Sequence, residues 1–385
     1  MNPYLVERLA PFGTTIFAEM SALAVATGAI NLGQGFPDTD GPDVVKQAAI
    51  DAITAGHNQY PPGIGVPELR HAIVAHQQRF YGLEYDADTE VLVTAGATEA
   101  IAATLLALCG PGDEVVTFEP YYDSYAACIA MAGAQRRVVT LDAPHYTFDP
   151  DALRAAITPR TRLLLLNSPH NPTGKVFTRE ELDLVAAVAQ EHDLVVVTDE
   201  VYEHLVFEGV HVPMATLPGM RDRTVTISSG GKTFSFTGWK VGWLCAAPEL
   251  TTAVQTAKQF LTYVNAGPFQ EAIAVGLALG DEYFSGLAAE LREKRDRLCA
   301  GLELAGFDVI RPQGTYFVTA DISPFGETDG LAFCRALPAR CGVVAVPSVV
   351  FYDNTVAGAS LVRFACCKRP EVLDEACTRL KALAR

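Results

Sequence analysis

The chain is organised as short apolar runs, rich in β-branched residues, that alternate with helix-like stretches. Seven such runs recur, at residues 90–94, 114–119, 136–141, 162–167, 194–199, 224–229 and 241–246. Several are apolar without interruption, which is typical of strands covered on both faces. Helix-like segments lie between many of them, and one begins with the capping-box pattern of Thr178 and Glu181. This alternation predicts an α/β fold with a largely parallel sheet.

The pattern changes after about residue 280. A long charged segment at 282–306 precedes short apolar runs near 307–320 and 360–366, and a last helix is expected near 370–384. This order predicts a smaller α+β domain, and a chain of 385 residues is long enough for two domains. We expect three parts: an N-terminal arm and the start of the small domain (1–45), a large domain (46–280), and a small C-terminal domain (281–385).

Composition excludes several classes of function. A formal net charge of −16 argues against a nucleic-acid surface, which needs clustered lysine and arginine. No apolar run approaches the roughly 20 residues that cross a bilayer, so we expect no membrane span. The nine cysteines form no CxxC pair, so we expect neither a metal site nor a disulfide framework. Such cysteine usage fits a reduced, cytoplasmic location.

Polar, glycine-rich or aromatic segments accompany the ends of five of the strand-like runs. They are AGATEA (95–100), PYYDSY (120–125), SPHNPTG (168–174), DEVY (199–202) and GGKTF (230–234). In open α/β sheets, ligands bind beyond the carboxyl ends of the strands. We therefore expect these five segments to converge at one edge of the sheet and to form the functional site.

The first segment has the composition of an anion site. Gly96, Ala97 and Thr98 lie where a strand turns into a helix, so small residues let the backbone approach an anion at the helix N-terminus. The ordinary alternative is a tight turn with Thr98 as the N-cap. With Ser229 and Lys240 also available, we favour a phosphate site.

Asp199 and Lys232 have the most demanding environments. A carboxylate at the end of a buried strand needs a partner, either an ion pair within the fold or the protonated ring nitrogen of a cofactor. Tyr202 could place its phenol on the same ring. Lysine is a nucleophile only when deprotonated, and burial or a neighbouring cation such as Lys240 lowers its pKa. A solvated surface is the usual place for a lysine, but the glycines and aromatics around Lys232 do not make a charged surface helix.

Three further residues also have ordinary structural interpretations. Asn171 lies between two prolines and could simply hold a turn. Tyr122 could pack in the core or stack on a flat ring. Tyr60 is expected in a loop and gains interest only if that loop reaches another subunit. A phosphate site, a carboxylate for a ring nitrogen, a stacking aromatic and a Schiff-base lysine together describe a site for pyridoxal 5'-phosphate (PLP).

Six motifs stand in an order and at a spacing typical of one enzyme family. They are NLGQGFPD (31–38), NQYPPGIG (58–65), SPHNPTGK (168–175), TDEVYEHLVF (198–207), SSGGKTFSFTGWKVGW (228–243) and LVRF (361–364). On these motifs the chain resembles, over essentially its whole length, the class I aminotransferases of PLP fold type I. The resemblance implies a seven-stranded, mostly parallel sheet in a large domain and a smaller α+β domain. It also implies a homodimer with shared active sites.

The resemblance implies which residues bind PLP: Tyr60, Ala97, Thr98, Tyr122, Asn171, Asp199, Tyr202, Ser229, Lys232 and Lys240. Lys232 would form the Schiff base and move the proton between the substrate Cα and the cofactor. Asp199 would pair with the pyridine nitrogen, and Tyr202 would hold the ring hydroxyl oxygen together with Asn171. Lys240 stands where many relatives have arginine, so its contact with phosphate is a point charge. Tyr60 would reach in from the partner subunit.

The resemblance also implies how the substrates, an amino acid and a 2-oxo acid, are bound. Arg363 would fork onto the α-carboxylate, and Gly35, Asn171 and Tyr316 would belong to the substrate pocket. Motifs such as FAEMSALA and EPYYDSYAACIAMAGA resemble N-succinyldiaminopimelate aminotransferases. This points to an exchange between N-succinyl-L,L-diaminopimelate and 2-oxoglutarate or glutamate, in lysine biosynthesis.

Two alternatives remain open. One is the kynurenine, glutamine and methionine branch of aminotransferases, whose motifs are similar. Kynurenine aminotransferases carry a Phe-His pair where this chain has Asn265 and Ala266, which would leave room for a longer polar substrate. The other is a PLP-dependent C–S β-lyase, which would use the same lysine and aspartate.

Overall fold

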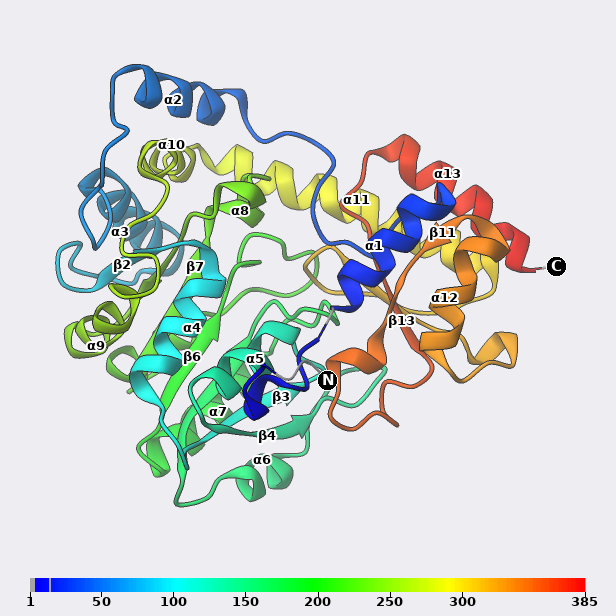
Figure 1. The fold of residues 1–385 in the computed structure, drawn as a ribbon, viewed down its shortest axis with the longest axis horizontal. Helices are drawn as coiled ribbons and strands as arrows, with labels where there is room; N and C mark the ends of the chain where they lie inside the picture. Colours follow the sequence, from blue (N-terminus) through cyan, green and yellow to red (C-terminus); the bar gives the residue numbers. More distant parts are fainter. Residues whose placement is uncertain (1–3, 14, 385) are drawn as a thin grey trace.

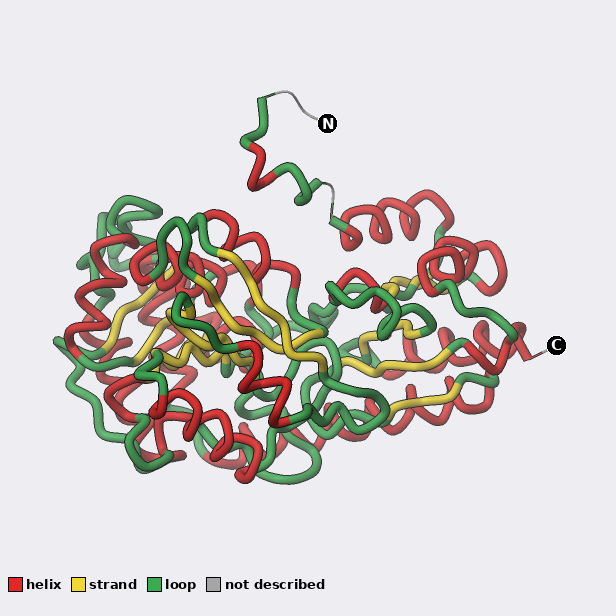
Figure 2. The backbone as a smooth tube through the Cα atoms, turned by 90° about the horizontal axis from the view of Figure 1, so that it is seen from below, coloured by secondary structure: helices red, strands yellow, loops and turns green. Residues whose placement is uncertain are grey.

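The computed structural model describes residues 4–13 and 15–384, and its strands form two groups at opposite ends of the molecule (Figures 1 and 2). The larger sheet has seven strands in the order β2-β8-β7-β6-β5-β3-β4. Their bounds are Val91–Thr94 (β2), Gly242–Cys245 (β8), Thr224–Ser229 (β7), Val195–Asp199 (β6), Thr161–Asn167 (β5), Glu114–Glu119 (β3) and Gln135–Thr140 (β4). β8 alone runs opposite to the other six strands, so its pairings with β2 and β7 are antiparallel. The predicted seven-stranded, mostly parallel sheet is confirmed.

Helices cover both faces of this sheet, which explains the uninterrupted apolar runs. Leu163 and Leu165 of β5 pack on one face, and Leu164 and Leu166 pack on the other. The first face is covered by α4 (Gly96–Leu108), α5 (Asp123–Met131) and α9 (Pro248–Lys258). The other face is covered by α6 (Pro150–Ala156) and α7 (Arg179–Glu191), and near β2 and β8 by α2 (Asp43–Thr54), α3 (Pro67–Tyr81) and α10 (Gly267–Leu277).

Two helix starts test the sequence analysis. In α7, Thr178 Oγ1 accepts a hydrogen bond from Glu181 N at 3.2 Å, and Glu181 Oε2 accepts one from Thr178 N at 2.9 Å. The predicted capping box is confirmed. In α4 the helix begins at Gly96, so Thr98 lies inside the first turn. The alternative interpretation of Thr98 as an N-cap is therefore wrong.

The second group of strands forms a smaller, separate core. An antiparallel sheet has the order β12-β13-β10-β9, and β1 pairs with β11 in parallel. The bounds are Val346–Pro347 (β12), Leu361–Ala365 (β13), Phe317–Asp321 (β10), Asp308–Ile310 (β9), Ile30–Asn31 (β1) and Val343–Val344 (β11). Around them pack α1 (Ile16–Thr27), α11 (Asp281–Ala305), α12 (Gly330–Cys341) and α13 (Pro370–Leu380). The sequence analysis missed α12 and the two-residue strands β11 and β12.

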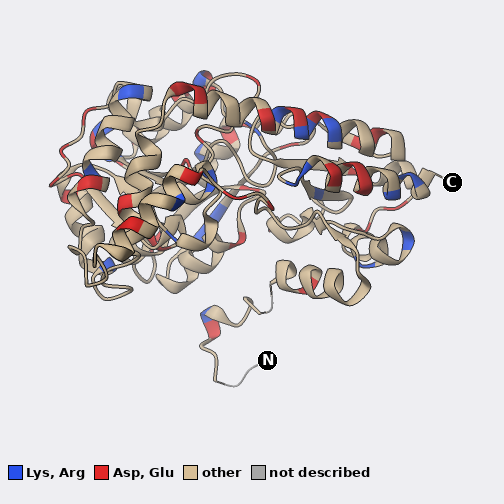
Figure 3. Cartoon of the chain, turned by 90° about the horizontal axis from the view of Figure 1, so that it is seen from above, with Lys and Arg blue, Asp and Glu red and all other residues tan. Residues whose placement is uncertain are grey.

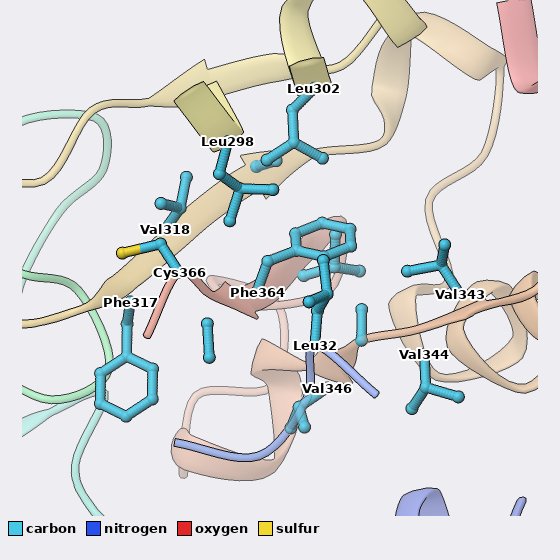
Figure 4. Close-up of a cluster of buried hydrophobic side chains, with 14 of the residues drawn as sticks. Leu32, Leu298, Leu302, Phe317, Val318, Val343, Val344, Val346, Phe364 and Cys366 are labelled. Atoms are coloured by element: carbon cyan, nitrogen blue, oxygen red, sulfur yellow. The ribbon is translucent and has the colours of Figure 1, made fainter. Parts of the chain in front are cut away.

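One long helix connects the two cores. Phe284, near the start of α11, belongs to the core under α3 and α10. Leu298 and Leu302, about four and five turns further along, pack beside Phe364 of β13 (Figure 4). Met20 of α1 belongs to this same smaller core although it is near the start of the chain. From these contacts we propose that the domain boundaries lie at residues 45 and 280.

The surface carries lysine and arginine interspersed with aspartate and glutamate (Figure 3). All nine cysteines are free thiols, and seven of them are buried. Across residues 4–13 and 15–384, no single helix is both long and apolar enough to cross a membrane. The pair α10 and α11 meets that criterion together, but the two helices are bent by 92°.

Candidate active site

A cavity of about 370 Å³ opens at the carboxyl end of the large sheet, where the five polar segments meet. All but two of the residues that the resemblance assigns to cofactor or substrate binding line it: Gly35, Ala97, Thr98, Tyr122, Asn171, Asp199, Tyr202, Ser229, Lys232, Lys240 and Arg363. The exceptions are Tyr60 and Tyr316. Because these residues come from both halves of the chain, only the fold brings them together.

Lys232 stands at the floor of this cavity, on the short helix α8 (Gly230–Thr233) that follows β7. Its Nζ donates to the Tyr316 hydroxyl at 3.0 Å, and that hydroxyl donates to Gly35 O at 2.7 Å. Tyr316 therefore contacts the Lys232 amine, although it does not line the cavity itself. Burial lowers the pKa of Lys232 to about 8, and the positive charges of Lys240 and Arg363 add to this effect. A useful fraction of the amine is thus neutral near pH 7.

Asp199 ends β6, and its side chain is buried beside α5. Its Oδ2 accepts a hydrogen bond from the Tyr125 hydroxyl at 2.6 Å. Burial raises the pKa of Asp199 to about 6, and the bond from Tyr125 opposes that rise. A buried carboxyl group with this pKa is suited to a cationic partner.

Asn167, at the end of β5, fixes the neighbouring segments. Its Nδ2 donates to Asp199 O at 2.7 Å, and its Oδ1 accepts from Asn171 N at 2.7 Å. The sequence analysis missed both Asn167 and Tyr125. Asn167 is the polar end of a predicted strand, and this position was an available signal. Tyr125 lies within α5, where its place in the PYYDSY segment does not distinguish it from a core residue.

Two glycines shape the anion-binding end of the cavity. A Cβ on Gly242 would lie 2.5 Å from Gly96 C and 2.7 Å from Ala97 N. A Cβ on Gly96, whose φ is +74°, would lie 3.1 Å from Lys240 Nζ. The absence of both side chains lets β8 and the Lys240 amine lie against the first turn of α4. The first N–H groups of a helix have no intrahelical partner, so this turn and the ammonium group together suit an anion.

Arg363 enters the cavity from β13 of the smaller sheet and is 1% exposed. Its Nη1 donates to Asn171 Oδ1 at 2.9 Å, and its Nη2 donates to Gly33 O at 3.0 Å. Its Nε is buried and has no partner among the described residues. Burial lowers the pKa of Arg363 to about 10, which leaves it charged at pH 7. A fixed guanidinium with donor capacity to spare is suited to a carboxylate.

Aromatic rings surround this guanidinium, and the sequence analysis did not find them. The Arg363 Cζ lies 4.0 Å from the Phe317 ring centroid, 5.0 Å from that of Phe351 and 5.1 Å from that of Phe17. Such contacts favour the charged form and limit its motion. Phe17 lies in α1, more than three hundred residues from Arg363, so no local pattern links the two.

Two expectations concern residues outside the cavity. Tyr60 is 80% exposed, and its ring packs edge-on against Tyr263, with centroids 5.7 Å apart. Its reach into a partner subunit stays a prediction. Neither Asn265 nor Ala266 lines this chain's own cavity, so the expectation that they leave room for a longer substrate stays a prediction. The Asn265 amide faces backbone carbonyl groups instead.

Comparison with known proteins identifies the family. Residues 27–380 match the model of the family described as aminotransferase class I and II. The chain belongs to this family. The solved structure of N-succinyldiaminopimelate aminotransferase from Mycobacterium tuberculosis superposes with a TM-score of 0.96 at 54% identity, covering 98% of this chain and 100% of that one. The methionine aminotransferase of Escherichia coli is 39% identical and covers 99% of both chains. A kynurenine–oxoglutarate transaminase of Dictyostelium discoideum is 37% identical over 97% of this chain and 95% of its own.

These aminotransferases share the fold described above, with PLP fold type I. The predicted fold class and family resemblance are both confirmed. The family uses PLP as its cofactor. Membership explains why a lysine, a buried carboxyl group and an arginine from two sheets meet in one cavity.

Proposed function

We propose that the chain transfers an amino group between N-succinyl-L,L-diaminopimelate and 2-oxoglutarate, with PLP bound at Lys232. One geometric observation carries the reaction type: the Lys232 amine shares a cavity with the buried carboxyl of Asp199 and the guanidinium of Arg363. The substrate assignment is supported by 54% identity over nearly the full length of the mycobacterial enzyme. It would place the chain in lysine biosynthesis.

The residues present fit PLP at both ends. The carboxyl of Asp199, whose pKa burial raises to about 6, suits the positive charge of a protonated pyridine nitrogen. The turn at Gly96, which a Cβ would fill, together with Lys240 suits the phosphate. We assign the phosphate also to Ala97, Thr98 and Ser229, the ring hydroxyl to Asn171 and Tyr202, and the ring face to Tyr122.

In the proposed mechanism, PLP would supply an electron sink that makes the substrate Cα–H bond acidic. Arg363 would bind the α-carboxylate and orient that bond. The Lys232 amine, once the incoming substrate amine has displaced it, would take the proton from Cα, and a pKa near 8 keeps this amine close to working pH. The Tyr316 hydroxyl, 3.0 Å from the lysine Nζ, holds the amine near its working position.

We also propose a cytoplasmic homodimer in which Tyr60 completes the neighbouring site. Nine free cysteines fit a reduced compartment. Two exposed aromatic residues lie on the loop that contacts Tyr60: Tyr263, which packs against its ring, is 53% exposed, and Phe260 is 81% exposed. Aromatic residues are enriched in the centres of protein interfaces, so this patch is the expected contact.

The test is the visible spectrum of the PLP-loaded protein while one amino donor at a time is added. N-succinyl-L,L-diaminopimelate and glutamate are expected to convert the Schiff-base band to the pyridoxamine band rapidly. A rapid response to methionine, glutamine or kynurenine alone would instead favour the second candidate function, which the likeness to the methionine enzyme supports. Release of a keto acid without any amino acceptor would indicate a C–S β-lyase.

Replacement of the lysine gives a direct prediction. Lys232→Ala is expected to abolish transamination, because Lys240, the other lysine that lines the cavity, is assigned to the phosphate. The circular dichroism spectrum should be unchanged. Lys46→Ala, at a partly exposed lysine paired with Asp40 and Asp43, is the matched control and should keep full activity. Undiminished turnover by Lys232→Ala would contradict the assignment.

A further inference from the structure

The loop between α9 and α10, residues 259–266, lies against the anion-binding end of the cavity. In this loop the Asn265 Nδ2 donates to two backbone carbonyl oxygens, Thr94 O at 3.1 Å and Lys240 O at 3.2 Å. Thr94 ends β2 just before the turn at Gly96, and Lys240 carries the amine that lies over that turn. One amide group thus joins the two backbone segments that build the anion site.

The orientation of this amide is fixed by its partners. Two carbonyl oxygens face the same side-chain nitrogen, so the opposite orientation would set three acceptors against one another. The Asn265 Oδ1 is buried and has no partner among the described residues. The backbone of Lys240 is left-handed, with φ of +54°, which is costly for a residue with a side chain. The bond to its carbonyl group therefore helps to hold it in that conformation.

The loop that presents Asn265 is itself tied to the same turn. Glu99 in the first turn of α4 accepts from Thr262 N at 3.2 Å and from Ala95 N at 2.6 Å. Gln270 of α10 donates its Nε2 to Asn265 O at 2.6 Å. The loop therefore provides a fixed support for the amide.

We propose that Asn265 is a positioning residue for the phosphate end of the cofactor. It acts through the carbonyl groups of Thr94 and Lys240, and it does not line the cavity. The inference rests on the proposed function, because it takes the anion to be the phosphate of PLP. The contribution of the phosphate to cofactor affinity then depends on Asn265, although Asn265 itself does not contact the phosphate.

The experiment compares PLP with pyridoxal, which lacks the phosphate, by equilibrium titration of the full-length apoprotein. Asn265→Ala should weaken PLP binding roughly ten-fold, because two hydrogen bonds are lost. Asn265→Asp should weaken it further, since a carboxylate would face two carbonyl oxygens and approach the phosphate. Pyridoxal affinity should stay at the wild-type value in both variants. Gln135→Glu, the same amide-to-acid change on the exposed edge strand β4, is the control and should change neither affinity.

A merely structural role would lower the affinities for PLP and pyridoxal alike, and that result would overturn the inference. An unchanged preference for PLP over pyridoxal would overturn it too. Asn265→Ser, which keeps one donor, is a milder variant should Asn265→Ala fail to fold, and its preference for PLP should lie between those of wild type and Asn265→Asp. Failure of the wild-type protein to bind PLP at all would contradict the proposed function instead.

Discussion

The hydrogen bond from Tyr125 to Asp199 controls the charge of a carboxyl group that the proposed mechanism needs ionised. A donor to the charged form lowers a carboxyl pKa, and Tyr125 opposes the rise that burial causes. Tyr125→Phe should therefore raise the pKa of Asp199 and move the acidic limb of the kcat/KM profile upward by about one pH unit. The measurement is the pH dependence of kcat/KM for the preferred donor.

Tyr352→Phe is the control for this prediction, because it makes the same chemical change at a tyrosine in the smaller core. Its profile should match that of the wild-type protein. An unmoved acidic limb in Tyr125→Phe would show that the Asp199 charge is set by other groups.

A second cluster of polar side chains joins α3 to β7 and to the segment that follows β6. His76 Nε2 and His204 Nε2 are 2.7 Å apart, and the Glu203 carboxylate accepts hydrogen bonds from Tyr81 at 2.7 Å and Ser228 at 2.6 Å. His76, Glu203 and His204 have the chemistry of metal ligands. Because both carboxylate oxygens and both facing imidazole nitrogens already have protein partners, we interpret the cluster as a buried hydrogen-bond network.

This network predicts a loss of stability in acid. Burial lowers the pKa of His76 to about 3 and that of His204 to about 4, so both stay neutral in the folded protein. In the unfolded chain they take up protons below about pH 6.5. Between about pH 6.5 and 4 the free energy of unfolding should therefore fall by about 1.4 kcal/mol per pH unit for each histidine. Urea unfolding at a series of pH values measures this slope.

His76→Gln should remove one histidine's share of that slope. His192→Gln, at an exposed residue after α7, should leave the slope unchanged. Equal slopes in both variants would show that His76 is not kept neutral by the fold.

At the scale of elements, β8 must approach the β2–α4 turn closely, and Gly242 permits it. An alanine there would place its Cβ 2.5 Å from Gly96 C, so the backbone would have to shift. Gly242→Ala should lower the melting temperature and weaken PLP binding by at least roughly ten-fold, because the anion site is displaced. Calorimetry and PLP titration measure the two effects. Gly238→Ala, where a Cβ would meet nothing within 4 Å, is the control.

The sequence predicted these elements unevenly, for physical reasons. Uninterrupted apolar runs such as residues 163–166 and the capping box at Thr178 are local signals, and they located the strands and helices correctly. The antiparallel direction of β8 was not predicted, because a buried strand has the same composition in either direction. The two-residue strands β11 and β12 are too short to show alternation.

The candidate site was predictable where its residues end strands, as with Asp199 and Lys232. It was not predictable where a residue acts through tertiary contacts. Tyr125 lies in an apolar helix and looks like a core residue until its hydroxyl is seen beside Asp199. No local pattern predicted the partners of the Asn265 amide, which are the backbone carbonyl groups of Thr94 and Lys240.

At the scale of the whole molecule, the role of Tyr60 can be tested with hybrid dimers. Tyr60→Ala and Lys232→Ala homodimers should each be impaired. If Tyr60 serves the neighbouring site, a hybrid of the two variants contains one fully intact site and should regain about half of the wild-type activity. The measurement is activity of purified hybrids that carry a different tag on each subunit.

Hybrids of Lys232→Ala with wild-type subunits supply the reference value for one working site. No recovery in the Tyr60→Ala hybrid would place Tyr60 in its own subunit's site. An unimpaired Tyr60→Ala homodimer would place it outside catalysis. A monomeric protein in sedimentation velocity would contradict the proposed homodimer itself.

Asp199 ends one strand of the seven-stranded sheet and Lys232 lies on the short helix after another, whereas Arg363 lies on a strand of the four-stranded sheet. In the proposed reaction, residues of the large domain therefore bind the nitrogen of an amino acid, and Arg363 of the small domain binds its carboxylate. A simple amine would reach only the large domain and would leave the two domains unbridged. The choice of amino acids over amines is thus encoded in the spacing between two sheets, and in neither sheet alone.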